Sequence, residues 1–238
     1  MGHSSSSQSK STPKSPVFDE PPRDENTPAR LVSLPRLLIV DPSHFIVDRS
    51  TITRSTLGLN TELCPIESPL FIEKTITEGV VSITITILSL SASDSYGDIR
   101  FGLLDSTVSF SSINNSLYFR FDRALGRSLL NSVAITSYNG CLKFTLPSSK
   151  HNPEWQFCHY ALTEGDCVRM EVDMDSTPRK VQFFVNGKDG GSYVSGLPPS
   201  VKIGFSVSNF GLSFRIDRIT QHEHPTPITP EMKEIRWN

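Results

Sequence analysis

The sequence predicts an all-β domain, either a sandwich or a barrel, and three observations support this. From Leu31 onward, apolar runs of four to eight residues rich in Val, Ile, Phe and Thr alternate with clusters of turn-forming residues. Between Val80 and Leu90, Ser and Thr alternate with apolar residues, which is the two-residue period of a strand. No stretch of a dozen residues combines helical periodicity with capping residues. Many short strands joined by turns are typical of sandwiches and barrels.

The expected strands follow from these runs in chain order. They are Leu37–Val40, Leu70–Thr77, Val80–Ser89, Ile99–Leu104, Leu117–Phe121, Val133–Ser137, Cys141–Thr145, Cys167–Met174, Lys180–Val185, Val201–Val207 and Leu212–Ile219. Helix is limited to one turn near Arg123–Gly126 and another near Pro230–Ile235.

Two hairpins can be read from their turns. Apolar and polar residues alternate strictly over 168–174, so we expect Arg169, Glu171 and Asp173 to lie on a solvated face. The turn 175–179 then leads into a returning strand that ends at Asn186-Gly187, whose two residues tolerate positive φ. Tyr138-Asn139-Gly140 closes a second hairpin in the same way.

The chain divides into three parts. Residues 1–30 are Ser, Pro and charge with few apolar side chains, so we expect a disordered tail. Its Thr12-Pro13, Ser15-Pro16 and Thr27-Pro28 pairs are either proline-directed phosphorylation sites or chance pairs in a Ser/Pro-rich segment, and Met1-Gly2 with Ser6 fits loosely an N-myristoylation motif. Residues 31–220 form the domain, and 221–238 form a polar C-terminal tail.

Composition narrows the function classes. Lys and Arg number 23 against 25 Asp and Glu, so a broad basic face for nucleic acid is not expected. No run of about 18 apolar residues occurs, so we expect no membrane-spanning helix. Four cysteines without a secretory signal indicate reduced thiols and a cytoplasmic protein. Oligomeric state has no signature in the sequence.

The C-terminal half carries a series of short motifs. A strand opens at Gly165-Asp166, the next ends in Phe184-Val185-Asn186-Gly187, and Gly190-Gly191 and Leu197-Pro198 lead to two final strands. In this order the motifs resemble those of the SPRY domain family. Upstream, Ile99–Asp105 is similar to a family strand and Ser137–Gly140 to a family hairpin. The resemblance covers roughly residues 31–220, although tryptophans common in SPRY strands are scarce here.

The resemblance implies a bent two-sheet antiparallel β-sandwich, a concanavalin A-like jelly roll. It also implies a protein-interaction module that has no cofactor and no enzymatic activity, and that binds a partner protein or short peptide through loops at one end. In peptide-binding SPRY domains an aromatic-glycine pair before the last strand lines the pocket, and Phe210-Gly211 occupies that position. Phe210 could equally cap the core.

Other loop residues could share that end of the sandwich with Phe210 and Gly211. An exposed aromatic side chain offers a large contact area, and a charged side chain can pair with a partner's opposite charge. The charged members could instead pair with one another or with water. These candidate partner-binding residues are Arg54, Tyr96, Asp105, Ser106, Thr107, Tyr138 and Asn139.

Catalytic and metal sites have weaker support. Asp173-x-Asp175-x-Thr177 begins like a calcium loop, but Pro178 stands where the sharp turn needs glycine. Cys158 and His159 are adjacent, so on a strand they would point to opposite faces, and we expect neither a metal nor a nucleophile there. Two alternatives remain: a carbohydrate-binding domain on the same sandwich architecture, and, with least support, a hydrolase built on a cysteine.

Overall fold

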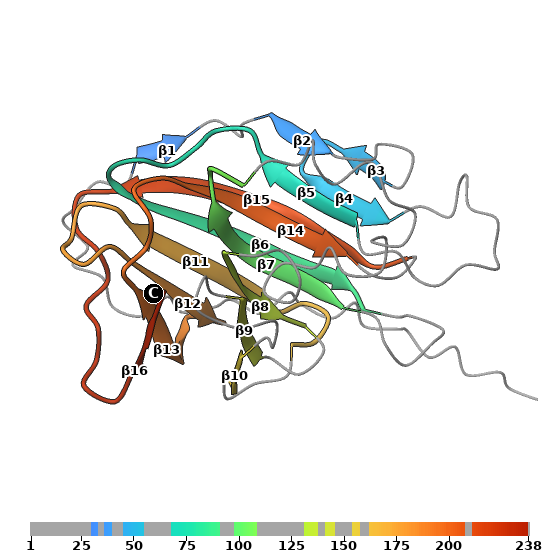
Figure 1. Ribbon diagram of the computed structural model, residues 1–238. Coiled ribbons are helices and arrows are strands. Elements are labelled where there is room, and N and C mark those ends of the chain that lie inside the picture. The colour runs from blue at the N-terminus through green and yellow to red at the C-terminus, as the bar shows by residue number, and fades with distance from the viewer. Residues whose placement is uncertain are drawn as a thin grey trace, which may run out of the picture.

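In the computed structural model the strands form two sheets that face each other, and most neighbouring strands in each sheet run antiparallel (Figure 1). This confirms the predicted all-β two-sheet sandwich. The structure describes residues 30–32, 36–39, 45–54, 68–90, 98–108, 131–137, 141–145, 154–157, 162–207 and 211–237. The predicted tail lies outside these residues except for Arg30, and so do the strand predicted at 117–121 and the helical turn predicted at 123–126.

The larger sheet has nine described strands. In spatial order they are β16 (Lys233–Arg236), β13 (Lys188–Ser195), β12 (Lys180–Val185), β11 (Cys167–Asp173), β6 (Val80–Ser89), β15 (Ser213–His222), β4 (Thr51–Arg54) and β3 (Phe45–Asp48), with β1 (Arg30–Val32) also paired to β15. All neighbours are antiparallel except β13 and β16, which run parallel. Both predicted turns after β11 and β12 are confirmed, and Asn186 and Gly187 have positive φ.

The smaller sheet has seven described strands. Their order is β10 (Glu154–Phe157), β9 (Cys141–Thr145), β8 (Ser132–Thr136), β7 (Ile99–Asp105), β14 (Val201–Val207), β5 (Ser68–Ile72) and β2 (Leu37–Ile39). Strands β8 and β9 pair antiparallel, as the predicted hairpin requires, although its turn residues 138–140 lie outside the described residues.

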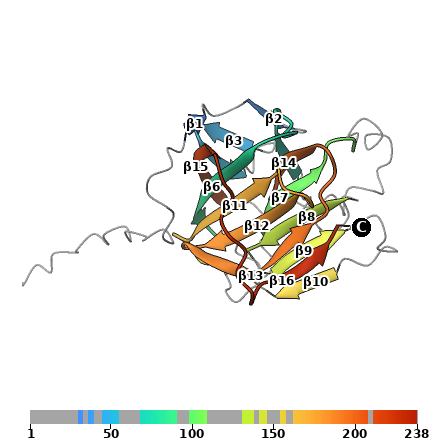
Figure 2. The same cartoon turned by 90° about the vertical axis from the view of Figure 1, so that its left-hand side faces the viewer.

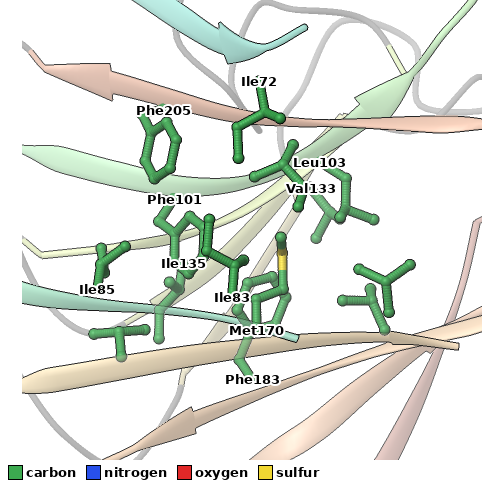
Figure 3. Close-up of a cluster of buried hydrophobic side chains, with 14 of the residues drawn as sticks. Ile72, Ile83, Ile85, Phe101, Leu103, Val133, Ile135, Met170, Phe183 and Phe205 are labelled. Carbon is green, nitrogen blue, oxygen red and sulfur yellow. The ribbon is translucent and has the colours of Figure 1, made fainter. Parts of the chain in front are cut away.

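The core lies between the sheets and is built from the apolar positions of the alternating strands. Ile83 and Met170 of the larger sheet face Phe101 and Ile135 of the smaller one (Figure 3). Burying an aliphatic or aromatic side chain contributes about 1.5–3 kcal/mol. The alternation read from the sequence therefore identified the inner faces of β6 and β11 correctly.

Six described strands were not predicted: β1, β3, β4, β10, β13 and β16. Strand β13 contains Gly190 and Gly191, which have low strand propensity, but it pairs on both sides, with β12 and β16. Between β3 and β4, Arg49 takes the left-handed conformation (φ 54°) that sequence rules reserve for Gly or Asn. Pairing, rather than intrinsic preference, determines these strands.

The prediction of a polar C-terminal tail from residue 221 was wrong. Strand β15 continues to His222, and residues 233–236 form a strand where a helical turn was expected. Met232, Ile235 and Trp237 are buried, and the last two belong to the core. Three apolar side chains in a charged segment were enough to fold it back onto the sheet.

The expected solvated face of β11 is also buried. Arg169, Glu171 and Asp173 are only 5%, 2% and 1% exposed. After β15 the chain crosses the outer face of the larger sheet, passing in front of β11 and β12 in Figure 2 before it enters β16. This crossing segment, rather than solvent, satisfies part of the polar face.

Candidate functional site

One end of the sandwich carries the end of β4 and Gly211 before β15, and we call it the Gly211 end. Strand β4 ends there next to the start of β15, through the pair Thr53–Ser213, and Ser213 also pairs with Ser89 at the end of β6. In the facing sheet, Val207 at the end of β14 pairs with Ile99 at the start of β7. Strands β4, β6 and β14 end here, and β5, β7 and β15 begin here.

A stack of three phenylalanines joins the two sheets just below the Gly211 end. Phe205 of β14 lies with its ring centroid 5.1 Å from that of Phe101 and 4.8 Å from that of Phe214. All three are fully buried. Stacked aromatic pairs at these distances add stability beyond the burial of their area, so the strand ends that carry the loops are fixed relative to one another.

A buried polar cluster links the start of β7 to the end of β8. Arg100 Nε donates to Asp98 Oδ2 at 2.7 Å, and Ser137 Oγ donates to Asp98 Oδ1 at 3.3 Å. Ser137 Oγ also accepts the backbone N–H of Ile99 at 2.8 Å. Since all three polar side chains are buried, removal of one partner would leave buried groups unsatisfied. The cluster makes this rim rigid.

The Gly-Asp and Asn-Gly motifs of the SPRY resemblance lie at the same end and are hydrogen-bonded to each other. Asp166 Oδ2 accepts the N–H and the hydroxyl of Thr163, while Asp166 Oδ1 accepts Asn186 Nδ2 at 2.8 Å. Asn186 Oδ1 in turn accepts the backbone N–H of Cys167 at 2.9 Å. The Gly-Asp and Asn-Gly pairs, twenty residues apart, therefore clamp the turn before β11 to the turn after β12, and their role is structural.

The structure places part of the predicted site at the Gly211 end. Arg54 closes β4 there, and Gly211, which is exposed and has φ 78°, precedes β15. Tyr96, Tyr138, Asn139 and Phe210 lie outside the described residues. They belong, in sequence, to the connections that leave β6, β8 and β14 at this end.

Asp105, Ser106 and Thr107 do not share that end, so this part of the prediction was wrong. Asp105 is the last residue of β7 and pairs with Val201 at the start of β14, and Ser106 and Thr107 follow it, so all three lie at the opposite end of both strands. Asp105 Oδ1 accepts the N–H and the hydroxyl of Thr107 at 2.9 and 2.8 Å, and Ser106 bonds to Ser200. These polar side chains stabilise their own turn.

Sequence reasoning missed the exposed turn Thr163–Gly165. It lies at the Gly211 end because Gly165 N donates to Ile87 O, and Glu164 Oε1 accepts the N–H of Leu90 at 2.9 Å. All three residues are exposed. Since Gly165-Asp166 had been recognised as the entry to a strand, the direction of that strand relative to its neighbours would have revealed the position.

Within the described ranges, the residues of the partial calcium motif serve a turn. In those ranges no three His, Cys, Asp or Glu residues lie close enough to hold a metal ion. The partial calcium motif is used in a turn, where Asp173 Oδ1 accepts the N–H groups of Asp175 and Ser176, and Asp175 Oδ1 accepts that of Gly79. His151, Cys158 and His159 lie outside the described residues. No described helix has the length and apolarity to cross a membrane.

Comparison with known proteins identifies the fold but not a family. No family model matches the sequence, and no curated protein matches it. Among solved structures, the SPRY domain of human HERC1 is similar over 74% of this chain and 95% of its own, with 14% identity and a TM-score of 0.50. This likeness confirms the concanavalin A-like sandwich.

Two further solved structures are similar at lower TM-scores. Peanut lectin with a nine-residue peptide matches 83% of this chain and 97% of its own at 13% identity, with a TM-score of 0.46. The TRIM65 PSpry domain matches 76% and 90% at 12% identity, with a TM-score of 0.45. SPRY domains and a lectin thus occur among the similar structures, and at these identities the likeness shows the fold alone.

Proposed function

We propose that this chain is a non-enzymatic protein-interaction module of the cytoplasm that binds a short segment of a partner protein at the Gly211 end. One observation carries the proposal: the register of β4, β6, β7, β8, β14 and β15 brings the loop-bearing strand ends to a single end of the sandwich. Loops held by a rigid scaffold are where binding residues concentrate.

The exposed residues at the Gly211 end favour a peptide or protein ligand. Glu164, Gly165 and Gly211 are exposed there, so backbone and carboxylate groups are available to an extended segment. The strand ends beneath are held by the Asp98–Arg100–Ser137 cluster and the phenylalanine stack. Such preorganisation lowers the entropy that binding has to overcome.

The test is selection of a displayed peptide library on four forms of the full chain: the parent, Phe210→Ala, Arg54→Ala and Thr107→Ala. Thr107→Ala is the matched control, because Thr107 is exposed at the opposite end. We expect one short motif to be enriched on the parent and on Thr107→Ala, and to be lost on Phe210→Ala and weakened on Arg54→Ala.

Two results would count against the proposal. Equal enrichment on all four forms would place the ligand elsewhere on the molecule. Absence of peptide enrichment together with binding to a glycan array would favour the carbohydrate-binding alternative.

A further inference from the structure

The segment between β15 and β16, residues 223–232, is hydrogen-bonded to the sheet through Thr226. We call it the C-terminal strap. No strap residue belongs to a helix or strand, and Glu223, His224, Pro227, Thr229, Pro230 and Glu231 are exposed. Thr226 is half-buried and contacts the sheet. The strap crosses the outer face of β11 and β12 on its way to β16 (Figure 2).

Thr226 makes three hydrogen bonds to the outer face. Its N–H donates to Glu171 Oε1 at 2.5 Å and its hydroxyl donates to Glu171 Oε2 at 2.9 Å, while its carbonyl oxygen accepts Gln182 Nε2 at 2.8 Å. Bonds to an ionised acceptor are among the strong ones in proteins. The hydroxyl of Thr226 therefore faces a carboxylate that is almost fully buried.

That carboxylate is already paired with a cation. Arg169 Nη1 donates to the same Oε2 at 2.9 Å, and its guanidinium lies 3.8 Å from the centre of the Phe184 ring. Lys180 is engaged with Asp173 at 3.7 Å. A further negative charge at Thr226 would therefore lie against the Glu171 carboxylate and share Arg169 with it.

Thr226 is followed by Pro227, and Thr229 by Pro230. A hydroxyl residue before proline is the pattern that proline-directed kinases recognise, and the irregular, exposed strap can be drawn out as an extended substrate. We propose that Thr226 is a phosphorylation site and that its modification releases the strap from the larger sheet.

The chemical step is a phosphoryl transfer from magnesium-bound ATP. The bond between the β,γ-bridging oxygen and the γ-phosphorus breaks, a bond forms from Thr226 Oγ1 to that phosphorus, the hydroxyl proton passes to a base of the kinase, and ADP leaves. The product carries about −1.5 to −2 charges at neutral pH in place of a hydrogen-bond donor. It therefore loses the donor that Glu171 accepted and gains repulsion against the same carboxylate. Release uncovers Glu171, Gln182 and the face of β11 and β12 that the strap now covers.

The experiment compares two variants of the full chain that can each accept one phosphate on the strap. In Thr229→Ala only Thr226 remains, and in Thr226→Val only Thr229 remains; other Ser-Pro and Thr-Pro sites are common to both. Each is treated with a proline-directed kinase and ATP, the sites are located by mass spectrometry, and amide hydrogen exchange of residues 223–237 is compared with the untreated form.

We expect Thr229→Ala to be phosphorylated at Thr226, with exchange in the strap at least about tenfold faster than before treatment, because two bonds to a charged acceptor are lost. Phosphate at Thr229 in Thr226→Val should change exchange by less than about twofold, since Thr229 is exposed. Unmodified Thr226, or phosphorylated Thr226 with unchanged or slower exchange, would overturn the proposal. Genetically encoded phosphothreonine at position 226 provides the same readout without dependence on the kinase chosen.

Discussion

Two Arg–carboxylate pairs in the larger sheet have the same spacing but different burial, and their comparison tests how much burial matters. Arg169 and Glu171 on β11 lie 2.9 Å apart with side chains 6% and 2% exposed. Arg215 and Asp217 on β15 lie 2.6 Å apart, with side chains 46% and 23% exposed. Each pair joins residues i and i+2 of one strand. Distance alone would rank the pair on β15 as the stronger.

We expect the opposite ranking when each carboxylate is replaced by its amide. In Glu171→Gln one of the two carboxylate oxygens becomes an NH2 group, which then faces either the Arg169 guanidinium or the backbone N–H of Thr226, and both of these can only donate. Breaking a buried ion pair from one side costs about 3–5 kcal/mol, because the remaining charge stays buried without its partner. In Asp217→Asn water can solvate Arg215, so the loss should stay below about 1 kcal/mol.

The assay is urea unfolding of parent and variants at pH 7 and fixed salt, with the free energy of unfolding taken from linear extrapolation. An unchanged denaturant dependence is the control that both variants unfold from comparable states. Equal losses for the two variants, or a larger loss for Asp217→Asn, would refute the reasoning from burial. A loss below about 1 kcal/mol for Glu171→Gln would show that the strap does not keep water from the pair.

Two further outcomes can be measured on single variants. Gly102→Ala would place a Cβ atom 1.9 Å from the carbonyl oxygen of Val133 and 2.6 Å from Ala134 Cα, so β7 and β8 must separate, and we expect a loss in unfolding free energy of about 3 kcal/mol or more. Gly165→Ala, whose Cβ would meet nothing within 4 Å but which has φ 90°, should lose only about 1–2 kcal/mol in the same assay, and a larger loss than that of Gly102→Ala would contradict the argument. The Ser195 hydroxyl, which donates to Glu234 at 2.6 Å, lowers the pKa of that carboxyl below its ordinary value of 4.5, assisted by Arg236. The hydrogen bond therefore stabilises the β13–β16 pairing fully above pH 4.5, and this stabilisation is lost as the pH falls through the lowered pKa of Glu234. NMR titration should show that the pKa of Glu234 rises in Ser195→Ala. An unchanged pKa would exclude the hydroxyl as the cause.

The sandwich could be predicted from the sequence because the apolar residues of each central strand mark the face of that strand that is buried. Ile83, Ile85 and Ile87 alternate with Ser and Thr on β6, and every second residue of β11 is apolar and fully buried. The outer face of β11 could not be predicted in the same way. Its charged residues are typical of solvated positions, and the segment that buries Glu171 is 55 residues further along the chain.

The candidate site was predicted in part for a related reason. Loop composition indicated Arg54, Gly211 and Asp105 equally well, since each follows or precedes an apolar run. Which of them share an end depends on the direction and register of strands distant in sequence, such as Val207 with Ile99 and Val201 with Asp105. Residue patterns within one loop do not contain that information.

The position of β15 determines when this chain can fold. It pairs with β6, with β4 and with β1, where Arg30 lies opposite Gln221. A growing chain therefore makes β1, β4 and β6 long before their shared neighbour exists, and their open edges must stay apart from other strands meanwhile. Such distant pairings are characteristic of domains that fold in milliseconds to seconds. Folding during synthesis must wait for residues 213–222, so the early strands need protection from aggregation until then.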